Sequence, residues 1–597
     1  MCRIAGKLDR TISFETLRQQ VDDMCDLQRH GGPDGEGRFV SPDDHLVLGH
    51  RRLALIELSA LGHQPMHYQD RYVITFNGEI YNYKELRNEL LKDGYQFHAH
   101  SDTEVILAAF ARWNTQSFSK LKGMFAFALW DQQEKELYLV RDAAGIKPLY
   151  YHLSPGGIEF ASEIRAFSYS GHRHTESREW PVLQLAYGHI PEPVTTLSNV
   201  KPLHKGCFLK YRSSTAATSL QSFSFYTFSE KINNREQATS ETKDGFEKAV
   251  TSHLLSDAPI GVFLSGGIDS SIITNIAAET QKEHLNTLSL YFNEAEFSEK
   301  QYQDILINKL QCKSLQHLLV EQEFESSFAK ILDDMDMPSC DGINTWFISK
   351  HAAKQGLKAV LSGIGGDELF GGYPSFGRIV TAKKLQQLPD IVLNAGKKNP
   401  NKRVSRLAYL QLEGIKGLYL FLRGQFTPTQ IASQLGCTEK EVWDILESTP
   451  VFPVTDNLDP KNEASWMEMN LYMQNQLLRD ADVMSMAHGL EIRVPFLDDD
   501  LIRKTCSIAP GVKFGGTLPK QLLIDAFKSD LPDAIFNRKK MGFSFPFTEW
   551  LGNSEYVKEL MSGSEKNTQL NYQKFLSGNL HWSNLMSLIL LRKRKAA

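Results

Sequence analysis

Apolar and polar residues alternate along much of the first 210 residues, with the two-residue period that is typical of β-strands. The stretch RYVITFNGEIYNY, residues 71–83, alternates up to an Asn-Gly pair that predicts a turn. FAFALWD and ELYLVRD are strand-like and are separated only by QQEK, so they predict a hairpin. A helix is predicted from Ser101, an N-cap residue with Glu104 at the capping-box position. Antiparallel strands with a few helices indicate an α+β domain.

The pattern changes further along the chain. Residues 213–238 are rich in Ser, Thr, Ala and Asn, a composition that predicts a linker. Beyond it, the apolar runs GVFL, NTLSLYF and LQHLLV alternate with helical segments, which indicates an α/β domain with a parallel sheet. After about residue 380 the pattern is mainly helical. We therefore predict domains at residues 1–212 and 239–597, joined by the linker.

Composition narrows the class of protein. A chain of 597 residues is expected to form two or three domains. The net charge of −5 gives no indication of nucleic-acid binding. No apolar run reaches the ~18 residues of a membrane span. The N-terminus lacks the apolar region of a secretion signal. The seven cysteines form no CxxC pair, which fits a reducing compartment. We predict a cytoplasmic multidomain enzyme.

Two glycine-rich loops carry the chemistry of the second domain. SGGIDSS, residues 265–271, lies between an apolar strand and a helix, where backbone N–H groups and the helix dipole favour an anion. SGIGGDELFGG, residues 362–372, also follows an apolar strand. Loops at the carboxyl ends of parallel strands meet at one crevice, so Asp269 and Asp367 are candidates to share a Mg²⁺ ion on phosphate oxygens. The alternative is that Asp269 caps its helix and Asp367 belongs to a turn.

Short recognisable stretches follow one another along nearly the full length of the chain: MCRIAG, RHGGPDGEG, GHRRLALIELS, QPM, FNGEIYN, SDTEVIL, GMFAFALWD, RDAAGIKPLYY, FASEIRAF, SGGIDSS, LSGIGGDELFGGY and MSMAHGLEIRVPFLD. SGGIDSS resembles the pyrophosphate loop of N-type ATP pyrophosphatases, and all of the stretches in this order resemble glutamine-dependent asparagine synthetases. The resemblance implies two domains: an N-terminal-nucleophile (Ntn) type glutaminase with antiparallel sheets, and an adenine nucleotide alpha hydrolase-like synthetase with a parallel sheet. It also implies an ammonia channel between them and a possible homodimer.

The resemblance assigns a role to residues of the N-terminal domain. Cys2, first in the chain after removal of methionine, would be the nucleophile, with its own α-amine as the base. The other candidates are Asn77 and Gly78 for the oxyanion, Arg52 for the glutamine carboxylate, and Glu79 and Asp102 for its ammonium group. The chain departs from the family pattern at Gly31, where RHRGPDG has an arginine, and at Arg3, where many members have glycine. The missing arginine is expected to loosen the order of the loop.

The resemblance also assigns the synthetase site. It implies ATP and a carboxylate as substrates, with an acyl-adenylate between them, and Mg²⁺ as cofactor. Lys520 would stabilise charge at the adenylate, and Asp269 and Asp367 would hold Mg²⁺. The nucleotide-binding residues would be Leu264, Ser265, Gly266, Gly267, Asp269, Ser270, Leu290, Ser362 and Gly363.

Ile364 is the departure that bears on the acceptor. Asparagine synthetases generally read LSGEG, with an acidic residue where this chain has Ile364. Either another group takes over that role on aspartate, or the acceptor is a different carboxylate, such as a sugar acid in polysaccharide or natural-product synthesis; Ile364 favours the second reading. An intramolecular amide-forming cyclase is opposed by Cys2, which such relatives usually lose. A non-enzymatic scaffold is opposed by the intact SGGIDSS loop.

Overall fold

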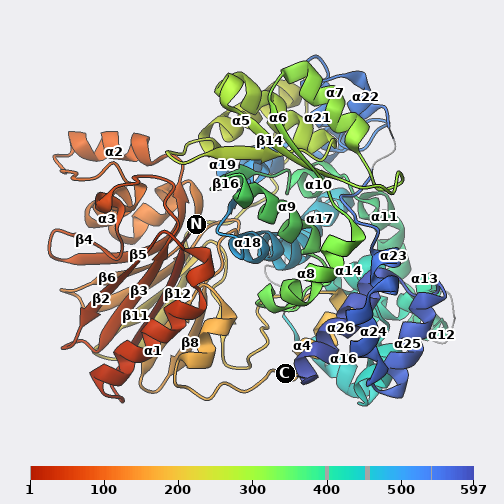
Figure 1. The fold of residues 1–597 in the computed structure, drawn as a ribbon, viewed down its shortest axis with the longest axis horizontal. Coiled ribbons are helices and arrows are strands. Elements are labelled where there is room, and N and C mark those ends of the chain that lie inside the picture. Colours follow the sequence, from red (N-terminus) through yellow and green to blue (C-terminus); the bar gives the residue numbers. More distant parts are fainter. Residues whose placement is uncertain (1, 397–401, 451–457, 539–540, 597) are drawn as a thin grey trace.

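Two six-stranded antiparallel sheets form the N-terminal part of the computed structural model, which describes residues 2–396, 402–450, 458–538 and 541–596 (Figure 1). The first sheet has the order β10 (Lys201–Pro202), β8 (Tyr150–Ser154), β9 (Gly157–Ala161), β1 (Arg3–Asp9), β3 (Leu46–Arg52) and β2 (Gly35–Ser41). The second has the order β12 (Ala217–Ser222), β11 (Cys207–Arg212), β7 (Glu136–Arg141), β6 (Gly123–Asp131), β5 (Tyr72–Ile80) and β4 (Met66–Tyr68). This confirms the predicted α+β architecture with antiparallel sheets.

Strand β6 shows why these sequences form a layered structure. Its side chains alternate between two faces, and every residue after Gly123 is buried. Ala126, Ala128 and Trp130 belong to the core that contains β1 and β3 residues of the first sheet. Phe125, Phe127 and Leu129 belong to the core beneath α3 (Asp102–Trp113) and α2 (Tyr83–Lys92). On the other side of the stack, α1 (Phe14–Leu27) covers the first sheet (Figure 1).

The structure confirms two local predictions and corrects two. β6 and β7 form the expected hairpin, with Asp131 paired to Glu136. Ser101 caps α3, since its side chain accepts a hydrogen bond from the Thr103 N–H. The predicted turn at Asn77-Gly78 is wrong, because β5 continues through both residues and pairs with β6 along its whole length. Glu104 does not complete a capping box; its carboxylate accepts the N–H groups of His98 and Ala99 instead.

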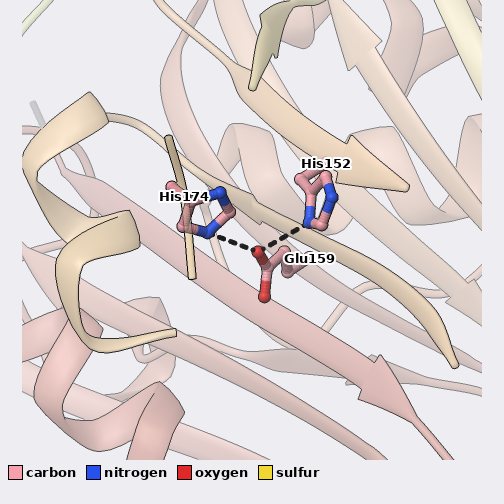
Figure 2. A group of neighbouring side chains, drawn as sticks. All are labelled: His152, Glu159 and His174. Carbon is pink, nitrogen blue, oxygen red and sulfur yellow. Dashed lines mark hydrogen bonds and ion pairs between the residues drawn. The ribbon is translucent and has the colours of Figure 1, made fainter. Parts of the chain in front are cut away.

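Polar side chains gather on the β8–β9 hairpin of the first sheet. His152 on β8 and His174 on the segment that follows β9 both contact the carboxylate of Glu159 on β9 (Figure 2). The chain then passes through β10 and β11. The segment predicted as a linker starts within this part of the fold, because β12 pairs with β11 from Arg212↔Ala217 to Cys207↔Ser222.

A five-stranded parallel sheet forms the core of the C-terminal part, as predicted. Its order is β15 (Lys313–Leu318), β14 (Asn286–Tyr291), β13 (Ile260–Phe263), β16 (Ala359–Leu361) and β17 (Glu491–Arg493). Because β13 and β16 are neighbours, the loops that follow them lie side by side at the carboxyl edge. These are the two glycine-rich loops of the sequence.

Helices surround this sheet and continue into a helical C-terminal region (Figure 1). Within the described residues, no helix is long and apolar enough to cross a membrane. The helices are α4 (Trp180–Tyr187), α5 (Arg235–His253), α6 (Ile268–Gln281), α7 (Lys300–Leu310), α8 (Glu321–Asp334), α9 (Ile343–Lys354), α10 (Gly366–Phe370), α11 (Pro374–Gln386), α12 (Asp390–Ala395), α13 (Lys402–Ser405), α14 (Gly414–Arg423), α15 (Pro428–Leu435), α16 (Glu439–Ser448), α17 (Pro460–Met467), the π-helix η7 (Glu468–Leu477), α18 (Leu478–Met486), α19 (Asp499–Ser507), α20 (Pro510–Lys513), α21 (Gln521–Phe527), α22 (Asp533–Phe536), α23 (Phe547–Asn553), α24 (Glu555–Ser562), α25 (Lys566–Leu576) and α26 (Trp582–Ala596).

Candidate active sites

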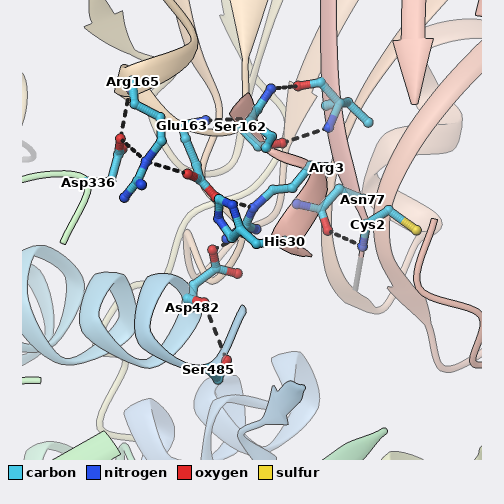
Figure 3. Close-up of polar contacts among 12 residues, drawn as sticks. Cys2, Arg3, His30, Asn77, Ser162, Glu163, Arg165, Asp336, Asp482 and Ser485 are labelled. Atoms are coloured by element: carbon cyan, nitrogen blue, oxygen red, sulfur yellow. Dashed lines mark hydrogen bonds and ion pairs between the residues drawn. The ribbon is translucent and has the colours of Figure 1, made fainter. Parts of the chain in front are cut away.

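Cys2 lies where the two antiparallel sheets meet. It precedes β1 of the first sheet, and its backbone nitrogen is 3.2 Å from Asn77 Oδ1 on β5 of the second (Figure 3). The thiol is buried, with Sγ 3.8 Å from the carbonyl oxygen of Leu53. Burial raises the pKa of the Cys2 thiol, although the positive charge at the N-terminus opposes this. A neutral thiol needs a base before it attacks. The nearest amine is its own, once Met1 is removed.

Asn77 has a buried hydrogen-bond donor without a partner in the described residues, and Gly78 lies next to it on β5. Asn77 Oδ1 accepts from Cys2, whereas Nδ2 is buried and has no hydrogen-bond partner within the part of the chain that the structure describes. Gly78 has φ +151°, and a Cβ there would lie 2.1 Å from the Met124 carbonyl oxygen. Only glycine therefore fits at this point of β5. An unpaired buried N–H donor beside a candidate nucleophile is what an oxyanion site requires.

The charged residues of the predicted amino-acid clamp each have partners in the structure. Arg52 ends β3, and its guanidinium donates to the carbonyl oxygens of Ser59, at 3.1 Å, and Glu57. Asp102 begins α3, where Oδ2 accepts the Ile80 N–H at 3.0 Å, and burial raises its pKa to about 6. Burial also raises the pKa of Glu79 well above its ordinary value, although Arg493 opposes this.

We expect the affinity for glutamine to fall as the pH drops below about 6. The carboxyl group of Asp102 is ionised only above its raised pKa, and a neutral carboxyl attracts an ammonium group much less. Well below that pH the dissociation constant should rise by about tenfold for each pH unit. Calorimetric titration of Cys2→Ala with glutamine between pH 5 and 8 measures this without turnover. Asp102→Asn and Glu79→Gln are the controls, because the pKa of Glu79 is raised as well; a pH dependence unchanged in both variants would contradict the assignment.

Arg3 and Gly31 are departures that compensate each other. A Cβ on Gly31 would lie 2.8 Å from Arg3 Cγ, so the Arg3 side chain fills the space beside this glycine. The Arg3 guanidinium is fully buried between Glu163, at 2.6 Å, and Asp482 of α18, at 2.9 Å (Figure 3). His30 also contacts Glu163, at 3.0 Å. The effect of Gly31 on the order of the loop stays a prediction.

We expect Arg3→Gly to lower the stability of the protein. Removing one partner of a buried ion pair costs about 3–5 kcal/mol, because the remaining charges lose their compensation. Thermal unfolding followed by circular dichroism should show a lower midpoint. The double variant Arg3→Gly/Gly31→Arg should recover part of the loss. An unchanged midpoint in the single variant would show that the buried arginine is not needed.

Hydrogen bonds that involve its own serine hydroxyl groups hold the SGGIDSS loop in place. Ser265 Oγ is 3.0 Å from Ser270 Oγ and accepts the Gly267 N–H at 3.2 Å. Gly266 has φ +87°, a left-handed conformation that favours glycine. The loop ends at the first turn of α6, whose dipole favours a bound anion. The predicted phosphate loop therefore has the geometry of an anion site.

Asp269, Asp367 and Lys520 come together from three segments of the chain. The Lys520 ammonium contacts both carboxylates. Although burial opposes it, Asp269 and Asp367 raise the pKa of Lys520, so the ammonium is charged. The two aspartate loops are packed tightly, because a Cβ on Gly366 would lie 2.7 Å from Asp269 Oδ1. Two adjacent carboxylates are hard oxygen ligands of the kind that Mg²⁺ prefers, so these residues fit the implied ion.

One cavity of about 530 Å³ joins these loops. Of the predicted nucleotide and metal residues, it is lined by Ser265, Gly267, Asp269, Ser270, Ser362, Gly363, Asp367 and Lys520. Leu264 and Leu290 are buried in the core at the strand ends and do not line it; their carbonyl oxygens accept from Ser289, at 2.7 Å, and Gln303, at 3.1 Å. Gly266 contributes its carbonyl oxygen to Arg538, at 2.9 Å.

The sequence reasoning missed several residues of this cavity. Arg538 lines it and is paired with Glu299 at 2.6 Å. Asp341 and Asp480, from the start of α9 and from α18, also line it. No motif connects residues so far apart in sequence, although the stretch DMPSCDGINT before α9 is as rich in turn residues and acids as the two recognised loops. The cavity therefore has an acidic end outside the predicted nucleotide site.

Arg493 joins the two candidate sites. Its Nη2 is 3.5 Å from Glu79 Oε1 in the N-terminal clamp, and its Nε is 2.5 Å from Glu491 Oε1. Its own carbonyl oxygen accepts the Ser362 N–H at 2.8 Å, at the start of the second glycine-rich loop. One residue thus contacts both the predicted glutamine clamp and the nucleotide loop.

Comparisons with known proteins agree with this arrangement. Residues 1–224 match the Glutamine amidotransferase domain, and residues 241–581 match Asparagine synthase. Asparagine synthetase [glutamine-hydrolyzing] 1 of Bacillus subtilis is 32% identical and aligns with 96% of this chain and 91% of that protein. Asparagine synthetase [glutamine-hydrolyzing] 3 of the same organism is 30% identical over 94% of this chain and 90% of its own length. Amidase chry2 of Gibberella zeae is 26% identical over 90% and 87%.

The two matched domains, a sandwich of antiparallel sheets followed by a parallel-sheet domain, define a glutamine-hydrolysing, ATP-dependent amidotransferase, a carbon–nitrogen ligase. The matches cover both parts of the chain and nearly the whole length of the Bacillus subtilis protein, which establishes the family. The chain belongs to the asparagine synthase family.

Proposed function

We propose that this protein hydrolyses glutamine in its N-terminal part and passes the ammonia to a carboxylate that its C-terminal part has activated with ATP. The products are glutamate, an amide, AMP and pyrophosphate. The observation that carries the proposal is the pairing of Cys2 with Asn77 in a protein that also brings Asp269, Asp367 and Lys520 to one nucleotide cavity. Assembly as a homodimer and location in the cytoplasm stay predictions.

The first half-reaction uses the groups around Cys2. Its sulfur attacks the amide carbon of glutamine while the thiol proton passes to the α-amine of the same residue. The oxygen of the tetrahedral intermediate takes hydrogen bonds from Asn77 Nδ2 and the Gly78 N–H, which together stabilise it by several kcal/mol. The amine then returns the proton to the departing ammonia, which leaves a γ-glutamyl thioester on Cys2. Water attacks this thioester, which releases glutamate and restores the thiol. Arg52 holds the glutamine carboxylate, and Asp102 and Glu79 attract its ammonium group.

The second half-reaction uses the loops around Lys520. The acceptor carboxylate attacks the α-phosphorus of ATP, and pyrophosphate leaves into the SGGIDSS loop. The Lys520 ammonium stabilises negative charge on the phosphate oxygens as the bond changes. Mg²⁺, when bound, would be held by Asp269 and Asp367 and would supply further positive charge there. Ammonia then attacks the acyl carbon and AMP leaves.

For the acceptor we propose aspartate. Ile364 lines the cavity but has neither charge nor hydrogen-bonding atoms, so it cannot replace the acidic residue of LSGEG. Asp341 and Asp480 supply carboxylates at the same cavity, and they are candidates for the group that takes over. Burial raises the pKa of both, and in Asp480 the neighbouring Asp341 adds to it. A cationic amino group bound there would relieve this cost. The relatives named asparagine synthetases support the same acceptor.

A second candidate is a carboxylate other than aspartate. Ile364 supports it, because an apolar wall beside the nucleotide suits a larger or less charged acceptor. Relatives named amidases, at 26% identity, show that the family is not uniform in name.

Carboxylate-dependent exchange of pyrophosphate into ATP tests the acceptor directly. The purified protein with Mg²⁺ is incubated with aspartate, sugar acids and other carboxylates in parallel. Exchange that requires aspartate, with asparagine formed once ammonia is added, supports the first candidate. Exchange with another carboxylate and none with aspartate would replace it with the second.

A further inference from the structure

Three histidines surround one buried carboxylate on the first sheet, apart from both proposed half-reactions. Glu159 is on β9, His152 is on the neighbouring strand β8, and His172 and His174 follow on the segment after β9. The exposed fractions of the Glu159, His152 and His174 side chains are 1%, 10% and 4%. Neither proposed half-reaction uses them. A buried carboxylate with several imidazoles requires its own explanation.

The geometry of three of these side chains is that of a metal site. His152 Nδ1 is 3.0 Å and His174 Nε2 is 3.1 Å from the same oxygen, Oε1 of Glu159 (Figure 2). The three ligand atoms all lie within 4.8 Å of one another. Bonds of about 2.0–2.1 Å in a tetrahedron place neighbouring ligand atoms about 3.3 Å apart, so small movements would admit an ion. Two imidazoles with one carboxylate form a ligand set typical of zinc.

The surrounding side chains hold this arrangement. Asn199 contacts the outer nitrogen of both imidazoles: Oδ1 is 3.0 Å from His174 Nδ1, and Nδ2 is 3.3 Å from His152 Nε2. Such contacts orient histidines that bind metals. The hydrogen bond from His174 Nδ1 leaves Nε2 ready to bind. A metal bound to His152 Nδ1 would leave the proton of that ring on Nε2. Two N–H donors would then face each other, so the Asn199 side-chain amide would have to move away from His152 Nε2.

The second oxygen of Glu159 has different neighbours. Oε2 is 2.9 Å from His172 Nδ1 and 3.5 Å from Lys7 Nζ, which also lies 3.5 Å from Asp9. Lys7 and His172 therefore balance charge on one side of the carboxylate and leave Oε1 to His152 and His174.

A second group, His317, Glu323 and His351, is less suited to a metal. There the Lys350 ammonium is 2.9 Å from Glu323 Oε1, the same oxygen that faces His351 Nε2 at 3.2 Å. The side chains are also more exposed, at 36%, 20% and 14%. A lysine on the shared oxygen competes with a cation, so this group serves as the comparison.

We propose that His152, Glu159 and His174 bind a zinc ion that fastens the segment after β9 to the β8–β9 hairpin. Water or the Ser170 hydroxyl, whose Oγ is 2.9 Å from His174 Nε2, would complete the four ligands. The ion would have a structural role, since the three residues lie outside the cavity of the nucleotide loops.

Zinc binding to the full-length protein tests the proposal. The protein is freed of metal with a chelator, titrated with Zn²⁺ against a chromophoric competitor, and checked for metal content by elemental analysis. We expect one ion per chain, a loss of affinity of at least about 100-fold in Glu159→Gln and His174→Gln, and about 10–100-fold in Asn199→Ala, which keeps all three ligands. Zn²⁺ should raise the midpoint of thermal unfolding of the unaltered protein and not of Glu159→Gln.

His317→Gln is the matched control, because it alters the other histidine–glutamate group. Full retention of zinc in this variant, with loss in the first two, supports the site. Equal binding in Glu159→Gln, loss of zinc in His317→Gln, or no stoichiometric binding by the unaltered protein would overturn it. If Glu159→Gln does not fold, the Asn199→Ala titration decides: unchanged affinity there, together with retention in His174→Gln, also overturns the proposal.

Discussion

Replacing Cys2 with alanine should abolish amide synthesis from glutamine and leave synthesis from added ammonia intact. The variant loses the sulfur that forms the bond to the substrate, and loss of a nucleophile of this kind costs on the order of 10⁴-fold or more in rate. The synthetase loops do not contain Cys2, so ATP–pyrophosphate exchange should continue. Measuring glutamate release and amide formation, each with glutamine or with ammonium chloride, separates the two activities.

The matched control for this variant is Cys437→Ala. Cys437 is a free, partly buried cysteine of the helical region, which neither half-reaction uses. This control should keep both activities. Glutamate release by Cys2→Ala at the rate of the unaltered protein would show that another nucleophile hydrolyses glutamine, and would remove the central assignment of the N-terminal site.

Replacing Lys520 with alanine should impair the synthetase reaction and spare glutamine hydrolysis, which is the reverse of the result for Cys2→Ala. Amide synthesis should fall with either nitrogen donor, and ATP–pyrophosphate exchange should fall by about 10²–10³-fold, as when one preorganised electrostatic contact is lost. Glutamine hydrolysis should persist, because Cys2 and its partners do not contact Lys520. The loss has a clear structural basis: Asp269 and Asp367 keep their charges while their shared cation is gone.

Lys528→Ala is the control for Lys520→Ala. Lys520 is the N-cap residue of α21, and Lys528 is an exposed lysine at the C-terminal end of the same helix. Removal of Lys528 should therefore leave exchange unchanged. Circular dichroism of both variants distinguishes a lost contact from a lost fold. Exchange at the normal rate in a folded Lys520→Ala protein would contradict the role given to this lysine.

The sequence predicted the elements whose pattern is local. The β6–β7 hairpin and the position of the two glycine-rich loops after neighbouring strands each depend on a short run of residues, and they form as expected. Asn77-Gly78 was misread because a turn dipeptide also suits a strand in which glycine is forced by a close approach, here to Met124. The Glu104 carboxylate accepts the N–H groups of His98 and Ala99. It therefore does not accept the backbone N–H of the N-cap residue, as a capping box requires.

Features that depend on distant residues were beyond the sequence pattern. Asp341, Asp480 and Arg538 reach one cavity only because α9, α18 and the segment after α22 converge on the sheet. The contact of Arg493 with both Glu79 and the Ser362 loop likewise depends on how the two parts of the chain pack. Such contacts leave no periodic signal in the sequence.

The filling of the space beside Gly31 by Arg3 matters for how sequences of this kind are compared. In this chain, Arg3 supplies both volume and positive charge at a buried point beside Gly31. A comparison made one position at a time treats Gly31 and Arg3 as two separate departures. Because the Arg3 side chain occupies the space beside Gly31, the two positions should instead be compared together.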